Sequence, residues 1–358
     1  MPFYSGLNSR RAEDKFIIDR LLTLRSSLDR NVPQRSLHES LLLATWNIRE
    51  FDSGKYGKRT RDAYYFIAEI IARFDLVAVQ EVNRDLTALK EVLKILGGYW
   101  DYLVTDVTEG SRGNQERMAF LYDSRKVKMG GLASEITFPP KRQKDADGKT
   151  IYMPQLQVAR TPFMVGFQAG WSRFILVSVH ILYGSSDAND PRRVEEIGKI
   201  AEFINKRSQD DRAWARNFIL LGDFNIFKKS DDTFKALTGN GFKVPDKMMD
   251  LPTNIGENKI YDQIAFRVRK DRFADEPVSS GVYRFFQSVF RAEDEAHYAA
   301  RMGKGYTHNR KGRRRTKDEK SRYYRDWRTH QMSDHYPMWA ELKIDYSDEY
   351  LERLKAKS

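Results

Sequence analysis

The sequence predicts an α+β fold in which two packed β-sheets are covered by helices on their outer faces. Expected elements run strand, helix, strand, helix and then mostly strands, an uneven order that disfavours a doubly wound parallel sheet. The 358 residues are 41% hydrophobic, enough for a large core. We find no internal repeat and no linker, and sheet-based folds do extend past about 250 residues as one domain.

The first forty residues are expected to form a helical extension. Apolar side chains recur at helical spacing from Phe16 through Ile17, Leu21 and Leu24 to Leu28, before a stop at 31–33. We interpret this as a helix packed on the outside of the core. The alternative is a helix that binds a partner.

The remaining elements follow from apolar runs and helical periodicity. Strands are expected over 41–48, 76–79, 174–179, 218–221, 261–266 and 336–342, with shorter ones near 102–105, 118–122 and 156–167. Helices are expected over 60–74, 86–96 and 190–207. These define one domain over 41–346, with a basic insert at about 291–332 and a C-terminal tail over 347–358.

The net charge of +12 is concentrated in that insert. Residues 301–332 contain twelve Lys or Arg against three acids, interleaved with tyrosine and tryptophan. This composition predicts a long surface loop, helical in its second half, that contacts nucleic acid through phosphates and stacked bases. The candidate contacts are Arg313, Arg314, Arg315, Tyr323, Tyr324 and Trp327. The alternative is a solvated loop that aids solubility.

Cysteine is absent, which excludes disulfides, thiolate chemistry and cysteine-ligated zinc. Neither a signal-peptide run at the N-terminus nor a stretch of membrane-spanning length is present. We therefore expect a soluble, cytoplasmic protein.

The most informative stretch is 217–227, NFILLGDFNIF. Its apolar run is expected to be a buried strand that ends at Gly222. Because strand side chains alternate, Asp223 and Asn225 would point to the same side. Such hard oxygen ligands suit Mg²⁺ or Mn²⁺ and a substrate phosphate better than zinc. On its own, GDFN is also compatible with a turn capped by an Asx side chain.

Five apolar strands end in residues of the same chemical set, and neighbouring strand ends would converge on one rim. The ends are Asn47, Glu81, His180, the pair Asp223 and Asn225, and the pair Asp334 and His335. Carboxylates and an amide hold a divalent cation, while histidines move protons near neutral pH. Glu116 and Asp262 are candidates to orient the two histidines. The set predicts in-line displacement at phosphorus.

The motifs ATWNIREF, LVAVQEV, QERMAFLYD, ARTP, SVHILYGSSDA, LLGDFN, IYDQIAF and SDHYP occur in that order. In this combination the chain resembles the endonuclease/exonuclease/phosphatase superfamily, and within it the deoxyribonuclease I group. The resemblance covers about 41–344 and implies a four-layer α/β/β/α sandwich of two facing mixed sheets covered by helices.

The resemblance also implies a role for each matching residue. Asn47, Glu81 and Asp334 match metal ligands, and Arg117 and Arg160 match arginines that face the phosphate. Glu116 matches the carboxylate that supports His180, and Asp262 the one that supports His335. Asp223 and Asn225 match a pair that contacts the reacting phosphate and a metal. Which histidine is the base and which is the acid stays open.

Two positions depart from the deoxyribonuclease I pattern. Asn83 stands where that group has an arginine that reaches the DNA minor groove, and Asn114 where it has a tyrosine. The favoured function is a Mg²⁺- or Mn²⁺-dependent DNA endonuclease with nucleic acid as its partner. The alternatives are an RNA-directed nuclease, a phosphoesterase on a phosphoinositide or sphingomyelin-type lipid, and a binding module without turnover.

Overall fold

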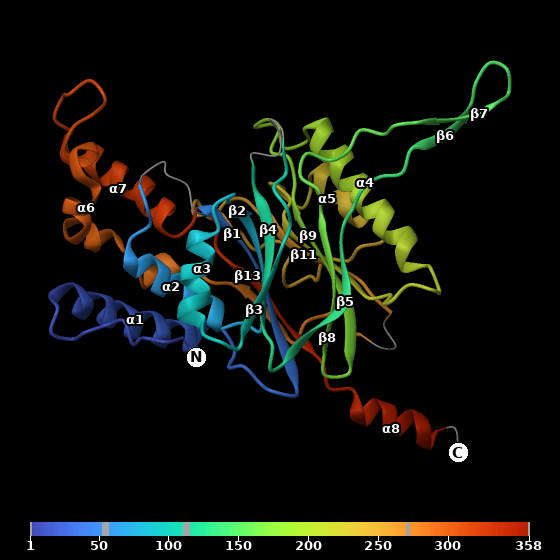
Figure 1. Ribbon diagram of the computed structural model, residues 1–358, viewed down its shortest axis with the longest axis horizontal. Coiled ribbons are helices and arrows are strands. Elements are labelled where there is room, and N and C mark those ends of the chain that lie inside the picture. The colour runs from blue at the N-terminus through green and yellow to red at the C-terminus, as the bar shows by residue number, and fades with distance from the viewer. Residues whose placement is uncertain (1, 52–56, 110–114, 270–272, 357–358) are drawn as a thin grey trace.

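The computed structural model describes residues 2–51, 57–109, 115–269 and 273–356 (Figure 1). Two large sheets face each other, and helices cover the outer face of each (Figure 1). The predicted α+β class and the four-layer arrangement are therefore confirmed. Asn114 lies outside the described residues.

The first sheet has the order β12-β13-β1-β2-β4-β3, in which β1 runs parallel to β2 and antiparallel to β13. Its strands are β1 (Ser40–Phe51), β2 (Leu76–Val82), β3 (Trp100–Val104), β4 (Arg117–Asp123), β12 (Ser279–Val282) and β13 (Met338–Lys343).

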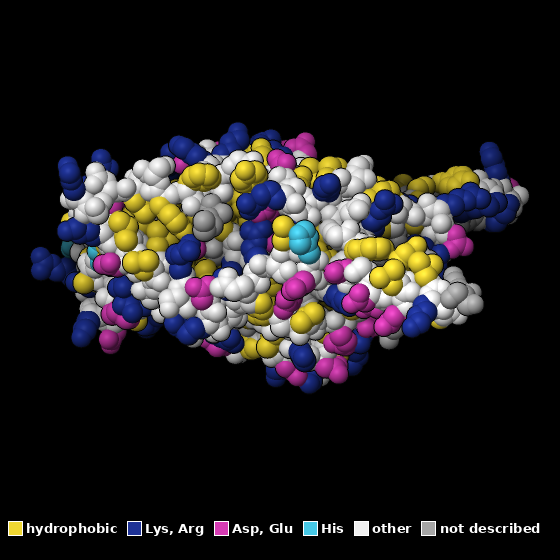
Figure 2. All heavy atoms as spheres, turned by 90° about the horizontal axis from the view of Figure 1, so that it is seen from below, with side chains coloured by type: hydrophobic (Ala, Val, Ile, Leu, Met, Phe, Trp, Pro, Cys, Tyr) yellow, Lys and Arg dark blue, Asp and Glu magenta, His cyan; other side chains and the backbone are white. Residues whose placement is uncertain are grey.

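The second sheet has the order β11-β10-β9-β8-β5. Its strands are β5 (Val127–Glu135), β8 (Phe163–Ala169), β9 (Ser172–His180), β10 (Phe218–Asp223) and β11 (Asp262–Arg267). A separate two-stranded arm, β6 (Lys141–Lys144) and β7 (Thr150–Met153), projects away from the body (Figure 1). Basic side chains project from it at one end of the face in Figure 2.

Two apolar clusters hold the layers together. One fills the space between the sheets and continues under α4 (Pro191–Ser208) and α5 (Asp232–Thr238). Phe120 of the first sheet and Phe167 of the second meet there edge to face, 5.4 Å between ring centroids. The other cluster lies on the outer face of the first sheet, under α2 (Arg61–Ala72), α3 (Thr87–Leu96) and α1 (Ala12–Asn31).

The N-terminal helix α1 packs on the body as the first interpretation proposed. Its apolar face is buried, and Arg20 forms an ion pair of 2.6 Å with Asp294. Phe16 stacks on His297, with 3.6 Å between ring centroids. This apolar face is therefore covered by the chain itself.

The basic insert differs from the predicted surface loop. It forms α6 (Glu295–Thr307) and α7 (Lys317–Gln331), which lie side by side against α1 and α2 (Figure 1). The predicted helix in its second half is confirmed. Tyr324 and Trp327 are 1% and 3% exposed and belong to the second apolar cluster. A nucleic-acid contact is therefore wrong for these two side chains, because they pack against Tyr298 of α6 and, for Trp327, against Phe290.

Several elements were not predicted, including β5, β12, the β6–β7 arm, α5 and the C-terminal helix α8 (Ser347–Lys355). Among the described residues, no helix combines the length and the apolar character needed to cross a bilayer.

Candidate active site

The strand register brings three predicted residues to one level of the second sheet. In the parallel pair β9–β10, His180 lies opposite Asp223, and in the antiparallel pair β10–β11, Asp223 lies opposite Asp262. Because neighbouring strands lie about 4.8 Å apart, these side chains form a row at the sheet edge. In the facing sheet, Asn47 of β1 is the partner of Gln80 in β2.

A tight backbone approach precedes Asp223. Gly222 has φ +135°, and a Cβ added there would lie 2.0 Å from the carbonyl oxygen of Val179. Glycine is thus required for β10 to reach β9 at this point. The strand ends at Asp223, and Asn225 follows with φ 53°.

The predicted alternation of Asp223 and Asn225 does not continue past the strand end. The backbone N–H of Asn225 donates to Oδ1 of Asp223 at 2.9 Å, so an Asx contact is present. Nδ2 of Asn225 donates to the carbonyl of Ile181 at 2.8 Å. Asn225 therefore ties the loop after β10 to the loop after β9, while Asp223 faces the histidines.

Each predicted histidine lies close to the carboxylate predicted for it. Nδ1 of His335 is 2.7 Å from Oδ2 of Asp262, and Nδ1 of His180 is 2.9 Å from Oε2 of Glu116. Oε2 of Glu116 also accepts from Nε of Arg160 at 2.8 Å. All five side chains are buried or largely buried.

The carboxylates raise the pKa of both histidines. For His180, burial and the charge of Arg160 act to lower the pKa, but Glu116 and Asp223 outweigh them and raise it. For His335, burial again opposes the shift, and Asp262 and Asp223 raise the pKa well above the usual value.

Asp223 lies between the two imidazoles. Its Oδ2 is 3.7 Å from Nε2 of His180 and 3.8 Å from Nε2 of His335. Both outer ring nitrogens therefore face one carboxylate oxygen, and a second carboxylate lies close to Nδ1 of each ring. This geometry places two proton-carrying groups around one small site, as general acid–base catalysis requires.

An oxygen-rich group adjoins Asp223 from the first sheet. Nδ2 of Asn47 donates to Oε1 of Glu81 at 2.9 Å and to Oδ2 of Asp223 at 3.0 Å. Oδ1 of Asn47 is buried and has no hydrogen-bond partner among the described residues. Glu81 adopts a left-handed backbone, φ 60°, beside a register shift in β2, and such irregularity concentrates at functional sites.

This donor set fits a hard divalent cation, because carboxylate and amide oxygens predominate. Among the described residues, a second possible metal site consists of Asp223, Asp262 and His335. One ligand atom from each lies within 4.8 Å of the other two. The oxygen donors of Asn47 and Glu81 adjoin this group through Asp223.

Asp334 and Arg117 do not join the central group as closely. The Asp334 side chain is 41% exposed, and its Oδ2 lies 3.7 Å from Nε of Arg49. Arg117 donates to the carbonyl of Thr105 at 2.7 Å and to Asp106 at 3.1 Å. Arg160 reaches the centre through Glu116, whereas Arg117 contacts the segment that follows β3.

Sequence reasoning missed Ser333 and Tyr261. Oγ of Ser333 donates to the carbonyl of Asn47 at 2.6 Å and accepts from the N–H of His335 at 2.9 Å. The ring of Tyr261 stacks on His335 with 5.5 Å between centroids. Both residues belong to motifs given above, SDHYP and IYDQIAF, but no spacing rule identifies a buried serine that hydrogen-bonds two backbone segments.

No protein-family model matches the sequence. A curated protein named "Deoxyribonuclease", from Thioalkalivibrio sp. (strain K90mix), is 30% identical over 192 residues, 52% of this chain and 46% of that protein. The chain therefore spans about half the length of this curated relative.

Two solved structures share the fold. The humanized D. rerio TDP2 with 14 mutations has a TM-score of 0.51 at 13% identity, covering 85% of this chain and 98% of that chain. The human Nocturnin catalytic domain with bound sulfate anion has a TM-score of 0.50 at 10% identity, covering 85% and 94%. At these identities the likeness concerns the fold alone.

Proposed function

We propose that this chain, which has the fold of the endonuclease/exonuclease/phosphatase superfamily, is a metal-dependent phosphodiesterase that cleaves the backbone of DNA. The observation that carries the proposal is the position of Asp223 between two imidazoles. Each imidazole has its own carboxylate close to Nδ1, the partly buried Glu116 for His180 and the fully buried Asp262 for His335.

The proposed reaction is an in-line displacement at phosphorus. One imidazole accepts a proton from a water molecule as its oxygen attacks the phosphorus. The P–O bond on the opposite side breaks, and the other imidazole gives a proton to the departing oxygen. Asp223 and Asn225 orient the water and the phosphate between these two rings. Proton transfer of this kind typically contributes about 10²- to 10⁴-fold in rate.

The proposed cation ligands are Asn47 and Glu81, with Asp334 beside His335 as the third. A divalent cation at such a site offsets the negative charge that builds on the phosphate oxygens. Support comes from the unpartnered Oδ1 of Asn47 and from the surrounding carboxylates. Mg²⁺ or Mn²⁺ is proposed, since hard oxygen donors suit both.

DNA is proposed as the substrate for two reasons. The curated relative carries the name Deoxyribonuclease. The α6–α7 segment also has a strong excess of positive charge, which attracts phosphates. Arg160 and Arg117 are proposed to contact the substrate phosphate. The cytoplasmic location expected from the absence of cysteine stays a prediction.

Cleavage of closed circular plasmid DNA tests the proposal. We expect nicked or linear products with Mg²⁺, and none with EDTA or with His180→Ala. His38→Ala is the matched control, because His38 is exposed and lies outside the proposed site, and it should cleave like the unaltered protein. Intact circles under every metal condition would reject DNA endonuclease activity, and cleavage that persists in His180→Ala would reject the assigned active site.

A further inference from the structure

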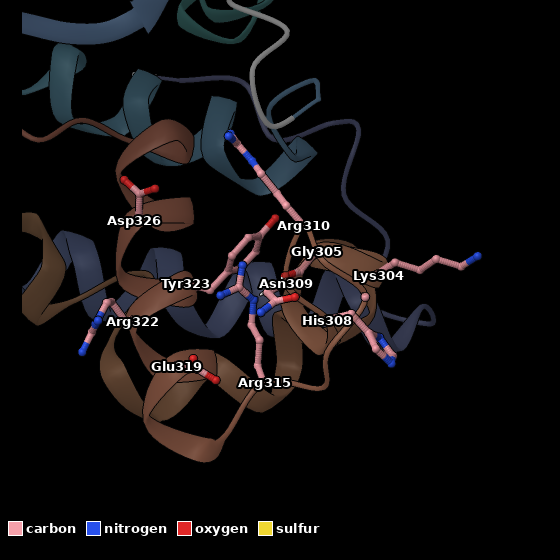
Figure 3. Close-up of a pocket in the computed structure, with 11 residues that line it drawn as sticks. Lys304, Gly305, His308, Asn309, Arg310, Arg315, Glu319, Arg322, Tyr323 and Asp326 are labelled. Carbon is pink, nitrogen blue, oxygen red and sulfur yellow. Dashed lines mark hydrogen bonds between the residues drawn. The ribbon is translucent and has the colours of Figure 1, made fainter.

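A large basic cavity lies in the α6–α7 segment, apart from the proposed catalytic group. Its volume is about 930 Å³, within the range of ligand-binding pockets. We call it the hairpin pocket and define it by six of its lining residues, Lys304, Arg310, Arg315, Arg322, Tyr323 and Asp326. Figure 3 shows Tyr323 and Arg315 at its centre, with Lys304, Arg310 and Arg322 extending outward from its rim.

Hydrogen bonds within the chain hold the walls of the hairpin pocket in place. The connection 308–316 is pinned by an antiparallel bridge between His308 and Arg314 and by a hydrogen bond of 2.9 Å from the N–H of Arg315 to the carbonyl of Thr307. Thr316 and Glu319 then form a reciprocal capping box that starts α7. The walls are therefore held in place before any ligand arrives.

The positively charged side chains at the rim of the hairpin pocket can bind an anion. Within the described ranges, no carboxylate lies at ion-pair distance from Lys304, Arg310 or Arg322. The acid Glu319 is instead paired with Arg313 at 2.5 Å. Asp326 lies 3.3 Å from Arg49. The exposed cations at the rim thus keep their capacity to bind phosphate.

An aromatic ring lies among these cations. Tyr323 is partly exposed, and the guanidinium of Arg315 lies 5.1 Å from its ring centroid. Nε of Arg315 donates to the carbonyl of Gly305 at 2.9 Å, which fixes the guanidinium in this position. An aromatic face in a basic groove is the pairing with which proteins hold unpaired bases and their phosphates.

Arg49 links the hairpin pocket to the proposed catalytic group. Asp326 lines the pocket and contacts Nη1 of Arg49, whose Nε is 3.7 Å from Oδ2 of Asp334. Asp334 immediately precedes His335. A chain that runs from the pocket across Arg49 would reach the proposed site of cleavage.

We propose that the hairpin pocket anchors an unpaired segment of nucleic acid, with a base against Tyr323 and phosphates on Lys304, Arg310 and Arg322. The inference rests on the proposed function, because it assigns the substrate of the same site. A duplex has its bases stacked inside the helix, so it would reach the rim cations but not the ring.

The test is binding of a labelled single-stranded deoxyoligonucleotide of about 15 nucleotides, followed by fluorescence anisotropy in EDTA. The background is full-length His180→Ala, which removes cleavage. Combined Lys304→Ala, Arg310→Ala and Arg322→Ala should weaken binding and make the log–log salt slope shallower by about 2, since each phosphate contact contributes about 0.7.

The control combines Lys128→Ala, Arg173→Ala and Arg212→Ala. These exposed cations lie before or near the starts of β5, β9 and β10, at the end of the second sheet away from His180. Binding should be unchanged. An equal loss in the control and pocket combinations would overturn the proposal, because it would mean that charge acts without a defined site.

The ring has its own test. Tyr323→Leu should weaken binding by about fivefold or more at an unchanged salt slope, and Tyr323→Phe should bind like the background. An unlabelled duplex of the same length should compete about tenfold less well than the single strand. Equal competition by duplex and single strand, or unchanged affinity in Tyr323→Leu, would contradict the stacking of a base on Tyr323.

Hydrolysis of a dinucleotide by the unaltered protein reports on the proposed function separately. If the dinucleotide is hydrolysed but the pocket substitutions do not weaken oligonucleotide binding, the proposed anchoring role is wrong and the proposed phosphodiesterase activity stands. Pocket-dependent binding without hydrolysis would support the anchor and count against the phosphodiesterase.

Discussion

Oδ2 of Asp262 lies 2.7 Å from Nδ1 of His335, although the two residues are 73 positions apart in the chain. Asp262 is fully buried and enters the site from β11, while His335 precedes β13 of the other sheet. The pair therefore forms only when the two sheets face each other. Burial alone would lower the pKa of His335, and the carboxylate raises it.

Asp262→Asn should lower the pKa of His335 toward the usual value or below it. In the unaltered protein the raised pKa contributes stability below the unfolded value of about 6.5, and this is lost as pH rises through the folded pKa. The variant should lose that contribution. Imidazole NMR titration of metal-free protein measures the shift, and an unchanged pKa would contradict the assigned pairing.

Asn47→Leu should reduce stabilisation by Mg²⁺. A ligand that binds only the folded state stabilises it by about 2.7 kcal/mol at a concentration of 100 Kd. The Tm of the unaltered protein should therefore rise with added Mg²⁺, and that of the variant should rise less. Asn240→Leu, beyond α5, is the control and should respond normally. An equal rise in Tm with Mg²⁺ in Asn47→Leu would show that Asn47 is not a ligand of the cation.

Ser333→Ala should impair both stability and turnover. The hydroxyl bonds the carbonyl of Asn47 and the N–H groups of His335 and Arg49, so its loss leaves buried backbone groups unpaired at a cost of about 1–3 kcal/mol. We expect kcat to fall more than KM changes. Ser280→Ala is the control, since its buried hydroxyl has no hydrogen-bond partner among the described residues. Equal stability and kcat in both variants would show that Ser333 positions nothing.

Arg35→Met should destabilise the end of the first sheet away from the site. Arg35 lies 2.6 Å from both Asp75 and Asp123, whose side chains are fully buried. An unpaired buried charge costs about 3–5 kcal/mol. Asp75 keeps its ion pair with Lys126 and Asp123 keeps the one with Arg125, so the loss should be smaller than that. Arg125→Met is the milder control, because Arg125 also contacts Asp123 but is 45% exposed.

The loss in Arg35→Met should depend on pH. Burial alone would raise the pKa of Asp123, but Arg125 and Arg35 lower it. The stability from this depressed pKa is present above the unfolded value of about 3.9 and is lost as pH falls through the folded pKa. Urea unfolding should therefore show a larger difference from the unaltered protein at pH ~7 than at pH ~3. A difference independent of pH would contradict the ion pair.

The strands that carry the site were largely predictable. Long apolar runs marked β1, β2, β9 and β10 because both faces of each are covered. The β6–β7 arm was missed, because β6 is exposed along its length and has no apolar pattern. The histidine–carboxylate pairings came from resemblance to a family, since nothing in the spacing of Glu116 and His180 indicates contact.

The sequence by itself determined the class of fold, the strand ends and the identity of the residues at those ends. These depend on local periodicity and on where an apolar run meets a polar residue. Only the tertiary structure decided that His180, Asp223 and Asp262 share one level, that Asp334 pairs with Arg49, and that Tyr323 lines a pocket while Tyr324 is buried. Those outcomes depend on strand register and on which helix faces are covered, and both are set by contacts between distant segments.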